Sequence, residues 1–487
     1  MKKLFTSLFA LVAFVSFANA TVYLVQSGSA GDKTWTSGAG TVVNLTSEGK
    51  SLTEWLNATT FANDDEVWIA GGTYTVTIAW TIPSSCPAKL YGGFVGTETA
   101  VDARVMGEKE WNYINETIIN GSGSSSGILG AGADRTIAID GITFTGCTTS
   151  ATQVVQQRPN MTIQNCKFTS NACTAVLYYI TSASRTATLK NSYFYGNTNE
   201  KTNGNGGCVN INNGSSGGVY TLTNCTFEGN SNANTGTAAS AGIKVQGAGT
   251  TNVMNSIFHE NSASAGYSSA ISSTVATAFV SNCVFYKNSG KPAAYSTMGN
   301  YTNCTFANNA NGAITITGTT PTTNVLTNSI FWGTTEGSSQ IYVSGSSNIA
   351  ATISYCAYLK LSTDQTNASN NQTLATSDPG FTDYTSGDFS LTTAATLLIG
   401  KANSSAAPAT DILGNTWDTA DIGAYAYKVG SGVSSTTNDN KQVVKKEYFN
   451  LTGVALGGSI IDCPKGLYIE KNTYDDGSAS SRKILKK

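Results

Sequence analysis

The stretch YTLTNCTFEGN, residues 220–230, contains the pattern that decides the fold of most of this 487-residue chain. From Leu222 it reads apolar, any residue, Asn, Cys or Ser, any residue, Phe, any two residues, Asn. Close copies occupy residues 163–171, 189–197, 253–261, 280–288 and 301–309, weaker ones 326–334 and 353–358, and a degenerate one 139–147. The anchoring asparagines recur every 21 to 33 residues, a period typical of solenoids, and are Asn165, Asn191, Asn224, Asn255, Asn282, Asn303 and Asn328.

Each copy suits two short strands that meet at a tight corner. Asn tolerates the left-handed backbone that such a corner requires. Leu222 and Phe227 would then point inward on either side of Asn224. In stacked coils about 4.8 Å apart, Asn would lie on Asn and Phe on Phe. We therefore predict an all-β fold, a single parallel β-helix, and we expect it to be right-handed because parallel crossovers almost always are.

The N-terminus reads as an export signal. Lys2 and Lys3 precede an apolar run over residues 4–17, which ends in Ala-Asn-Ala at residues 18–20. We expect cleavage after Ala20. The first cysteine is Cys86, which excludes a lipid-anchored N-terminus, and no later stretch has the 18 apolar residues of a membrane span.

Composition agrees with an exported, polar β-solenoid. Charged residues make up 12% of the chain, and 50 residues are Gly. The net charge of -2 offers no basic surface for nucleic acid and no polybasic patch for a membrane. One elongated domain explains the length better than several globular ones, because solenoids grow by adding coils.

Residues 21–135 read as an N-terminal cap with the first coils, and residues 136–428 as the repeats with a closing segment. Residues 51–60 (SLTEWLNATT) predict a short helix with Leu52, Trp55 and Leu56 on one face. We expect this helix to close the open end of the first coil.

Specific segments of the cap and of the closing region resemble one protein family. They are DEVWIAGGTY at residues 65–74, YGGFVGTE at 91–98, DPGF at 378–381, DFSL at 388–391 and DILGNTWDTADIGAYAY at 411–427. Together they resemble secreted, Bacteroidetes-type right-handed β-helix proteins of the pectate-lyase-like superfamily, although Ala426 stands where that family usually has Glu. The repeats also resemble those of polymorphic outer-membrane proteins. The resemblance to the secreted Bacteroidetes-type proteins covers residues 21–428. It implies that the protein comes from a Gram-negative bacterium and is secreted or associated with the outer membrane.

The C-terminal part differs in composition. Residues 429–442 read as a flexible linker, and residues 443–487 as a small β unit with a basic end. The segments NLTG at 450–453 and KGLYI at 465–469 resemble the sorting segment of the type IX secretion route, which implies contact with an outer-membrane export machinery. A hairpin that only covers the last coil is the alternative.

The ten cysteines favour buried thiols over disulfides. Five of them follow a corner residue, in a position that Ser192, Ser256 and Ser329 take in other copies. A position shared by Cys and Ser requires a small side chain, and side chains stacked in one direction have poor disulfide geometry. These five are Cys166, Cys225, Cys283, Cys304 and Cys356.

The sequence contains few residues that could form a catalytic site. His259, the single histidine, is expected in a solvated loop between copies. Residues 141–360 contain no Asp, and their glutamates are Glu200, Glu228, Glu260 and Glu336. Glycoside hydrolysis needs two facing carboxylates, whereas Glu228 and Glu260 stand one and two places after their Phe and are expected to lie off register. A polysaccharide lyase would need a Lys or Arg base and a cluster of acidic calcium ligands. Lys190, Lys244 and Arg185 could supply the base, but the sequence has no such acidic cluster.

Other polar motifs read as structure. Asp64 and Asp65 fit a turn before a strand, and the aspartates 411, 418 and 421 fit a closing segment, with a structural cation as the less favoured alternative. The Gly-rich stretches 203–207 and 214–218 lack the setting of a phosphate loop and read as loops between strands. The sequence therefore names no catalytic, cofactor-binding or metal-binding residue and no cofactor.

The spacers between copies are the remaining candidate surface. Residues 197–205, 229–241 and 261–269 are rich in Ser, Thr, Asn and Gly. Such loops on a rigid scaffold suit weak, multivalent contact with glycans or host-surface molecules, or they simply keep it soluble. We expect an exported, non-catalytic adhesion or glycan-contact protein. The alternatives are a divergent lyase or hydrolase of acidic polysaccharide and a structural envelope component.

Overall fold

The computed structural model describes residues 20–486 except 37, 84–85, 88, 123–126, 131, 133, 149–152, 181–184, 200–205, 213–216, 234–238, 275–276, 318–322, 336–339, 344–349, 363–365, 429–442, 451–453, 458–465 and 475–478. The export signal expected in residues 1–20 falls almost entirely outside these residues, as does the linker expected at 429–442. The chain divides into two compact units, Met1–Tyr427 and Lys428–Lys487.

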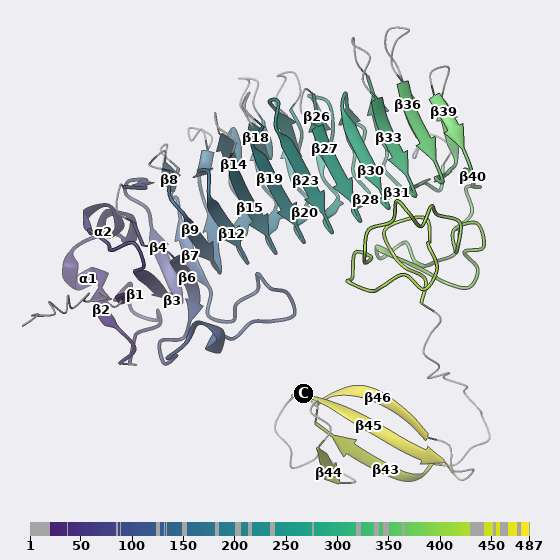
Figure 1. Cartoon of the computed structure of the whole chain (residues 1–487). Coiled ribbons are helices and arrows are strands. Elements are labelled where there is room, and N and C mark those ends of the chain that lie inside the picture. The colour runs from purple at the N-terminus through teal and green to yellow at the C-terminus, as the bar shows by residue number, and fades with distance from the viewer. Residues whose placement is uncertain are drawn as a thin grey trace, which may run out of the picture. The chain divides into compact units, whose positions relative to one another are not determined.

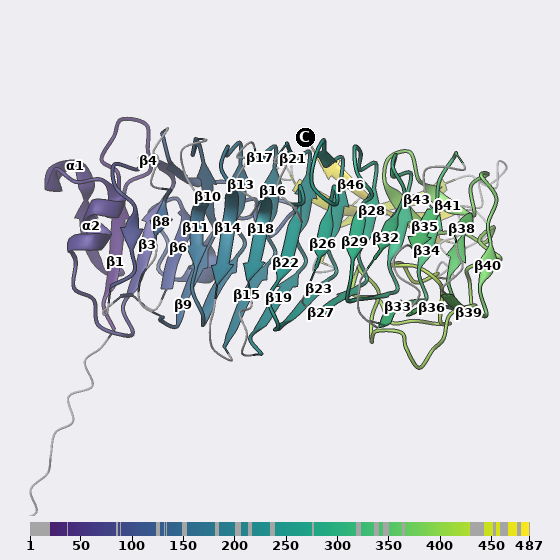
Figure 2. The ribbon, with the colours of Figure 1, turned by 90° about the horizontal axis from the view of Figure 1, so that it is seen from above.

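The first unit is a right-handed parallel β-helix, as the repeats predict. Three long parallel sheets run side by side along the stack of coils, and each coil between residues 66 and 362 contributes one strand to each sheet (Figures 1 and 2). A short parallel sheet adds β17 (Thr198–Asn199), β21 (Ser231–Asn232) and β25 (Ser262–Ala263).

The three long sheets, here called A, B and C, have these strands in spatial order. Sheet A consists of β2 (Thr41–Asn44), β1 (Val22–Gln26), β3 (Glu66–Ala70), β6 (Lys89–Phe94), β9 (Ile137–Asp140), β12 (Met161–Gln164), β15 (Thr186–Lys190), β19 (Val219–Thr223), β23 (Thr250–Met254), β27 (Thr277–Ser281), β30 (Gly299–Thr302), β33 (Thr323–Thr327), β36 (Ala350–Ser354) and β39 (Thr366–Ser369). Sheet B consists of β4 (Gly72–Thr75), β7 (Thr117–Asn120), β10 (Ile142–Thr145), β13 (Lys167–Thr169), β16 (Tyr193–Tyr195), β20 (Thr226–Glu228), β24 (Ile257–His259), β28 (Val284–Tyr286), β31 (Thr305–Ala307), β34 (Ile330–Trp332), β37 (Ala357–Tyr358) and β40 (Gln372–Thr373). Sheet C consists of β38 (Lys360–Ser362), β35 (Gln340–Val343), β32 (Ile314–Ile316), β29 (Ala294–Ser296), β26 (Ile271–Ser273), β22 (Ile243–Gln246), β18 (Gly207–Asn212), β14 (Ala175–Ile180), β11 (Gln153–Gln157), β8 (Leu129–Gly130) and β5 (Trp80–Thr81).

The anchoring asparagines turn the corner from sheet A to sheet B. All seven have a left-handed backbone, with φ between 49° and 54°. Their amides form a ladder: Asn191 Nδ2 donates to Asn165 Oδ1 (3.0 Å), and Asn224 Nδ2 donates to Asn191 Oδ1 (2.8 Å). The prediction that Asn stacks on Asn at the corner is confirmed.

A second asparagine ladder closes the other end of each sheet B strand. Asn230, the last residue of its repeat, is fully buried and does not itself adopt the left-handed backbone, which the preceding Gly229 takes instead (φ 61°). Its Nδ2 donates to Phe194 O and to Asn261 Oδ1 (both 2.9 Å), and its Oδ1 accepts from the backbone N (3.0 Å) and Nδ2 (2.9 Å) of Asn197. Each close copy of the repeat therefore contains two left-handed positions rather than the one that the sequence suggested.

Stacked side chains fill the interior. Leu222 and Phe227 are fully buried, as predicted. The phenylalanines of sheet B, from Phe144 to Phe331, stack with ring centroids 4.4 to 5.0 Å apart. The cysteines of the described residues are buried free thiols. In the position that Cys and Ser share, Cys225 N donates to Ser256 Oγ on the next coil (3.1 Å).

Two helices lie at the N-terminal end of the described residues, α1 (Leu45–Glu48) and α2 (Leu52–Ala58). Ser51 and Glu54 form a capping box that starts α2, and Thr59 ends it with extended backbone. Leu52, Trp55 and Leu56 are buried against the core of the first coils. The short helix predicted over residues 51–60 therefore closes that end of the stack.

Residues 95–116, here called the entry loop, fold over the outer side of the corner and include the 3₁₀ turn η1 (Val101–Ala103). Arg104 lies 3.4 Å from Asp140, and both side chains are buried. Asp140 also accepts from Tyr113 Oη (3.2 Å) and Asn165 Nδ2 (2.9 Å), so it ends the corner ladder. Gly141 takes the corner position because a Cβ there would lie 2.7 Å from the Tyr113 ring.

Residues 378–427, the closing segment, pack along the outer side of the last coils. They include the antiparallel pair β41 (Phe381–Asp383) and β42 (Asp388–Leu391). Asn303 Nδ2 donates to the backbone oxygens of residues 421 and 423, both at 3.0 Å. The buried Asp411 and Asp421 accept from backbone N–H groups of the segment itself. Among the described residues, these aspartates do not belong to a group that could bind a metal ion.

The second unit contains an antiparallel sheet in the order β44 (Ala455–Gly457), β43 (Val443–Phe449), β45 (Gly466–Tyr474) and β46 (Ala479–Lys486). Glu470 is buried there, 3.6 Å from Lys446 Nζ, and it accepts from Tyr448 Oη (3.2 Å). The unit is thus a small β sheet.

Candidate functional site

The outward face of sheet B is covered at one end by the entry loop. Trp111 stacks on Tyr193, with ring centroids 5.6 Å apart and planes 13° apart. Glu116 Oε1 accepts from Thr143 Oγ1 (2.6 Å) and from Lys167 Nζ (2.9 Å). These contacts attach the loop to the first coils of the sheet.

The closing segment covers the other end of the same face. Trp332, Ile330 and Val284 point outward from sheet B and are buried in a core shared with the closing segment. Phe389 of β42 meets the Tyr286 ring edge-on at 5.3 Å. In Figure 1 the entry loop and the closing segment lie on the same side of the stack, and the middle coils run between them.

A stretch of sheet B between these two covers keeps polar and aromatic side chains at least partly exposed. We call it the sheet B window and define it by Tyr193, Tyr195, Glu228, His259, Glu260 and Tyr286, together with Trp111 at the edge of the entry loop. Tyr195 is 46% exposed, and its ring lies nearly parallel to that of Tyr193, 5.7 Å away. Tyr193 Oη donates a short hydrogen bond, 2.6 Å, to Glu228 Oε2.

Glu228, His259 and Glu260 meet within the window. Strands β20 and β24 pair so that Glu228 lies beside His259, whose Nε2 is 3.4 Å from Glu228 Oε2. The left-handed backbone of Glu260 (φ 56°) keeps its carboxylate near this pair. One ligand atom of each residue lies within 4.8 Å of the other two.

The imidazole of His259 is held by stacking rather than by hydrogen bonds. Its ring lies parallel to that of Tyr286, with centroids 4.8 Å apart, and its side chain is 14% exposed. Its Nδ1 atom is buried, with no hydrogen-bond partner among the described residues. The ring is therefore fixed in place while its nitrogens remain largely uncommitted.

Burial governs the protonation of the window. Burial lowers the pKa of His259, and the ammonium group of Lys287 lowers it further. The carboxylates of Glu228 and Glu260 act in the opposite direction and raise this pKa. Burial and the hydrogen bond to Glu228 hold the pKa of Tyr193 well above its ordinary value, and burial raises that of Tyr286 to about 12. At neutral pH both phenols are thus protonated and the imidazole is uncharged.

One expectation from the sequence is wrong here. His259 does not lie in a solvated loop, because it is the last residue of β24 and is mostly buried. Glu228 and Glu260 are off register, as expected, because β20 and β24 pair Glu228 with His259. Their carboxylates nevertheless come within 4.8 Å of one another, where the backbone of Glu260 is left-handed. Alignment of the copies could have predicted that His259 lies on a strand beside Glu228, because both residues directly follow the buried Phe of their repeat.

The other sequence candidates do not join this site. Asp65 accepts from the backbone N of Thr21 (2.8 Å) and of Ala62 (2.7 Å), as the predicted turn requires. Arg185 lies 3.7 Å from Asp134 and is partly exposed, and Lys244 is buried on β22 of sheet C.

The spacer loops expected to contact glycans lie partly outside the described residues, as do the Gly-rich stretches. Their described parts include β17, β21 and β25, beside sheet C. Tyr267, in the last spacer, stacks on Tyr295 with ring centroids 4.2 Å apart. The window is a different surface, which the spacer pattern did not predict.

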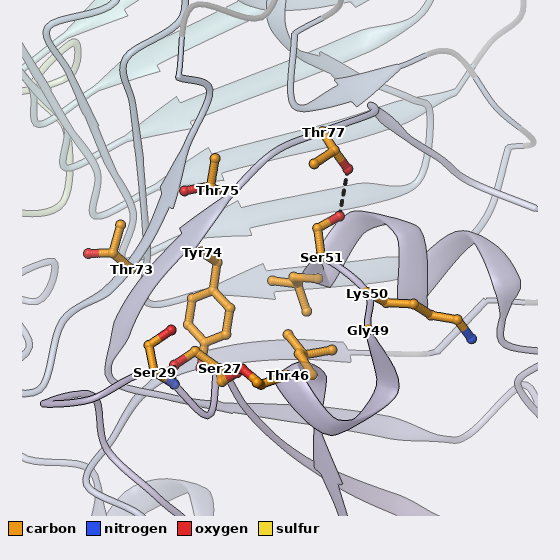
Figure 3. A pocket seen from close by; sticks show the side chains of 12 residues that line it. Ser27, Ser29, Thr46, Gly49, Lys50, Ser51, Thr73, Tyr74, Thr75 and Thr77 are labelled. Carbon is orange, nitrogen blue, oxygen red and sulfur yellow. Dashed lines mark hydrogen bonds between the residues drawn. The ribbon is translucent and has the colours of Figure 1, made fainter.

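Two pockets lie nearer the N-terminus. The first, of about 350 Å³, is lined mainly by hydroxyl groups at the cap, where Ser51 Oγ meets Thr77 Oγ1 at 2.8 Å, and the ammonium end of Lys50 extends away from it (Figure 3). The second, of about 370 Å³, is lined by Val101, Asp102, Arg104, Met106 and Tyr113 of the entry loop. Neither pocket gathers a pair of carboxylates or a histidine.

Comparisons with known proteins give little beyond this geometry. No protein-family model and no curated protein matches the chain. A solved structure, that of pectate lyase Pel9A, is similar to it, with 14% sequence identity, a TM-score of 0.44, and coverage of 84% of this chain and 96% of that one. No helix in the described part of the chain is long and apolar enough to span a membrane.

Proposed function

We propose that this protein contacts polysaccharide without cleaving it, and that the sheet B window is the contact surface. The observation that carries the proposal is the run of rings Trp111, Tyr193 and Tyr195 beside the carboxylates of Glu228 and Glu260. Aromatic faces offer apolar area to the C–H faces of sugar rings, while carboxylates and phenols accept and donate hydrogen bonds.

The charges of the window favour an uncharged chain over an acidic one. Glu228 and Glu260 are its carboxylates. The nearby ammonium of Lys287 is engaged, because Nζ donates to Thr385 O at 2.8 Å. Carboxylates repel anionic ligands. The ligand class we infer is therefore a neutral oligosaccharide or polysaccharide.

Binding of the full-length chain to an array of neutral and acidic glycans, followed by titration calorimetry on the hits, tests the proposal. Tyr195→Ala should weaken binding about tenfold or more, as truncation of a central aromatic contact does. Tyr342→Ala is the matched control, because Tyr342 on sheet C is 47% exposed and lies outside the window. No binder on the array, or an equal effect of both variants, would contradict the proposal and favour a structural envelope role.

A specific observation keeps a second function in view, hydrolysis of a polysaccharide. Oxygens of Glu228 and Glu260 lie within 4.8 Å of one another, close to the spacing of about 5 Å between the two carboxyl groups of retaining glycosidases. Release of reducing ends from a neutral polysaccharide, abolished by both Glu228→Gln and Glu260→Gln, would establish it. Binding with no turnover supports the non-catalytic proposal.

We further propose that the protein belongs to the secreted Bacteroidetes-type β-helix proteins and reaches the surface of a Gram-negative cell through its C-terminal unit. The support is the family-like segments at residues 65–74, 91–98 and 411–427 and the sorting-like segments at 450–453 and 465–469. Antibody labelling of intact cells, with and without residues 448–487, tests the sorting role. Unchanged surface labelling after the truncation would refute it.

A further inference from the structure

The Glu228, His259 and Glu260 cluster has the donor atoms of a transition-metal site. Two carboxylate oxygens and an imidazole nitrogen suit Zn²⁺ and the neighbouring first-row divalent ions better than Ca²⁺, which prefers six or more oxygens. The ligand atoms lie within 4.8 Å of one another.

The spacing of the first two ligands already matches such an ion. Two ligands about 2.1 Å from a tetrahedral zinc ion lie about 3.4 Å apart. His259 Nε2 and Glu228 Oε2 are separated by 3.4 Å. Glu260 is exposed, so a change of rotamer can bring its carboxylate closer.

The surroundings hold these ligands in place. Tyr193 Oη fixes the Glu228 carboxylate by its 2.6 Å hydrogen bond, and Tyr286 fixes the imidazole plane by stacking. Backbone pairing fixes the main chain of Glu260, whose N–H donates to Tyr286 O at 3.2 Å, while its exposed side chain can still change rotamer. Outer contacts that orient a carboxylate and an imidazole are a regular part of metal sites.

The state of the imidazole is an independent observation. A histidine that serves only packing usually has its buried nitrogens hydrogen-bonded, because a buried polar atom without a partner is destabilising. His259 Nδ1 is buried without a partner among the described residues, and Nε2 faces only Glu228, at a distance long for a hydrogen bond. Nε2, which faces Glu228 and is not held by a short hydrogen bond, is therefore the nitrogen that can bind an ion.

We propose that Glu228, His259 and Glu260 bind one divalent transition-metal ion of the Zn²⁺ class, with at least one coordination position left for water or for a ligand oxygen. The ion would offset the negative charge of the neighbouring carboxylates of Glu228 and Glu260. Its binding does not require a glycan, so the failure of either proposal leaves the other standing.

The single histidine makes a direct test possible. In tag-free, full-length protein labelled with ¹⁵N-histidine, the imidazole gives one set of nitrogen signals. Titration with ZnCl₂ at neutral pH should shift that set with one-to-one stoichiometry, and calorimetry should give the same stoichiometry. Glu228→Gln and Glu260→Gln should each weaken binding at least about tenfold.

Glu108→Gln is the matched control, because Glu108 is an exposed carboxylate on the entry loop. It should bind zinc as the unaltered protein does. An imidazole signal that zinc leaves unshifted overturns the proposal. So does a shift that persists undiminished in both Gln variants, since it would show binding by the imidazole alone.

Discussion

Asn230 shows how one side chain can specify a coil. Its amide makes four hydrogen bonds to the coils before and after it, and all of them lie in the buried interior. Asn224, six residues earlier, has a different role, because it supplies a left-handed corner near the surface. The same residue type therefore serves a turn at one position and a buried ladder at the other.

Asn230→Ala should lower the free energy of unfolding by about 3 kcal/mol or more, because it leaves several buried polar groups unpaired at about 1–3 kcal/mol each. Asn224→Gly should cost less, because Gly keeps the left-handed backbone and only the ladder contact to Asn191 is lost. Denaturant unfolding of both variants measures the difference. Equal losses would contradict the distinction between the two ladders.

The buried thiols predict an alkaline limit to stability. Burial raises the pKa of Cys225 to about 12, above the ordinary value of about 8.5. The folded state thus favours the neutral thiol, so the stabilisation is complete below pH 8.5 and is lost as the pH rises toward 12. Cys225→Ser introduces the residue that Ser192 and Ser256 supply in the same position, and this variant should lose less stability than the unaltered protein between pH 8 and 10.5.

Denaturant unfolding at pH 8 and at pH 10.5 measures the change in stability. Mass spectrometry then identifies which cysteine thiols have reacted with a labelling reagent. Cys225 should stay unlabelled by iodoacetamide in the native protein at pH 8 and react once the protein is unfolded. Rapid native labelling of Cys225 would show that its coil is more open than its complete burial indicates.

Two elements outside the repeats determine which part of sheet B stays open. The entry loop is attached by the buried Arg104 and Asp140 pair, and the closing segment by its bonds to the Asn303 and Asn328 corners. Each covers one end of the outward face, so the window lies between them, with Trp111 of the entry loop at one edge and Tyr286, against Phe389, at the other. The repeats supply its residues, and the two covers set its limits.

Arg104→Met should destabilise the first unit by about 3–5 kcal/mol, because it leaves the Asp140 carboxylate buried without its cation. The Arg104 side chain also lies over the rings of Tyr91, Phe94 and Tyr113. Arg104→Lys keeps the positive charge but not this stacking, so it should retain only part of the stability that Arg104→Met loses. Thermal and denaturant unfolding measure the effect. Asp102→Asn, at an exposed position on the same loop, should change stability by less than about 0.5 kcal/mol.

At the scale of the whole first unit, coils are interchangeable parts. Coils that carry close copies of the repeat place their Asn, Cys or Ser, and Phe in register with the next, so contacts are almost all between neighbours. Removal of one complete coil should therefore preserve the pairing of those that remain.

Deletion of residues 256–282 joins Asn255 directly to Cys283 and should give a folded, shorter β-helix, with Asn255 in the place of Asn282. Deletion of residues 256–269 removes about half a coil and should prevent correct stacking. Circular dichroism and thermal unfolding of both variants distinguish them. Equal behaviour of the two would contradict a stack of exchangeable coils.

The sequence by itself determined the β-helix, its corners, its Phe stack and its buried thiols. These features repeat at a regular position, so a local pattern that recurs reports how neighbouring coils must pack. The helix at residues 52–58 was predictable for the same reason, since its cap and its apolar face lie within a few residues.

Only the tertiary structure decided the window. Glu228 and His259 are 31 residues apart and meet through the pairing of β20 with β24, while the backbone at Glu260 brings in the third group. Trp111 and Phe389 come from segments outside the repeats, and their contacts with Tyr193 and Tyr286 follow from how those segments fold back. A local pattern does not encode such contacts, because they depend on the path of the chain between distant residues.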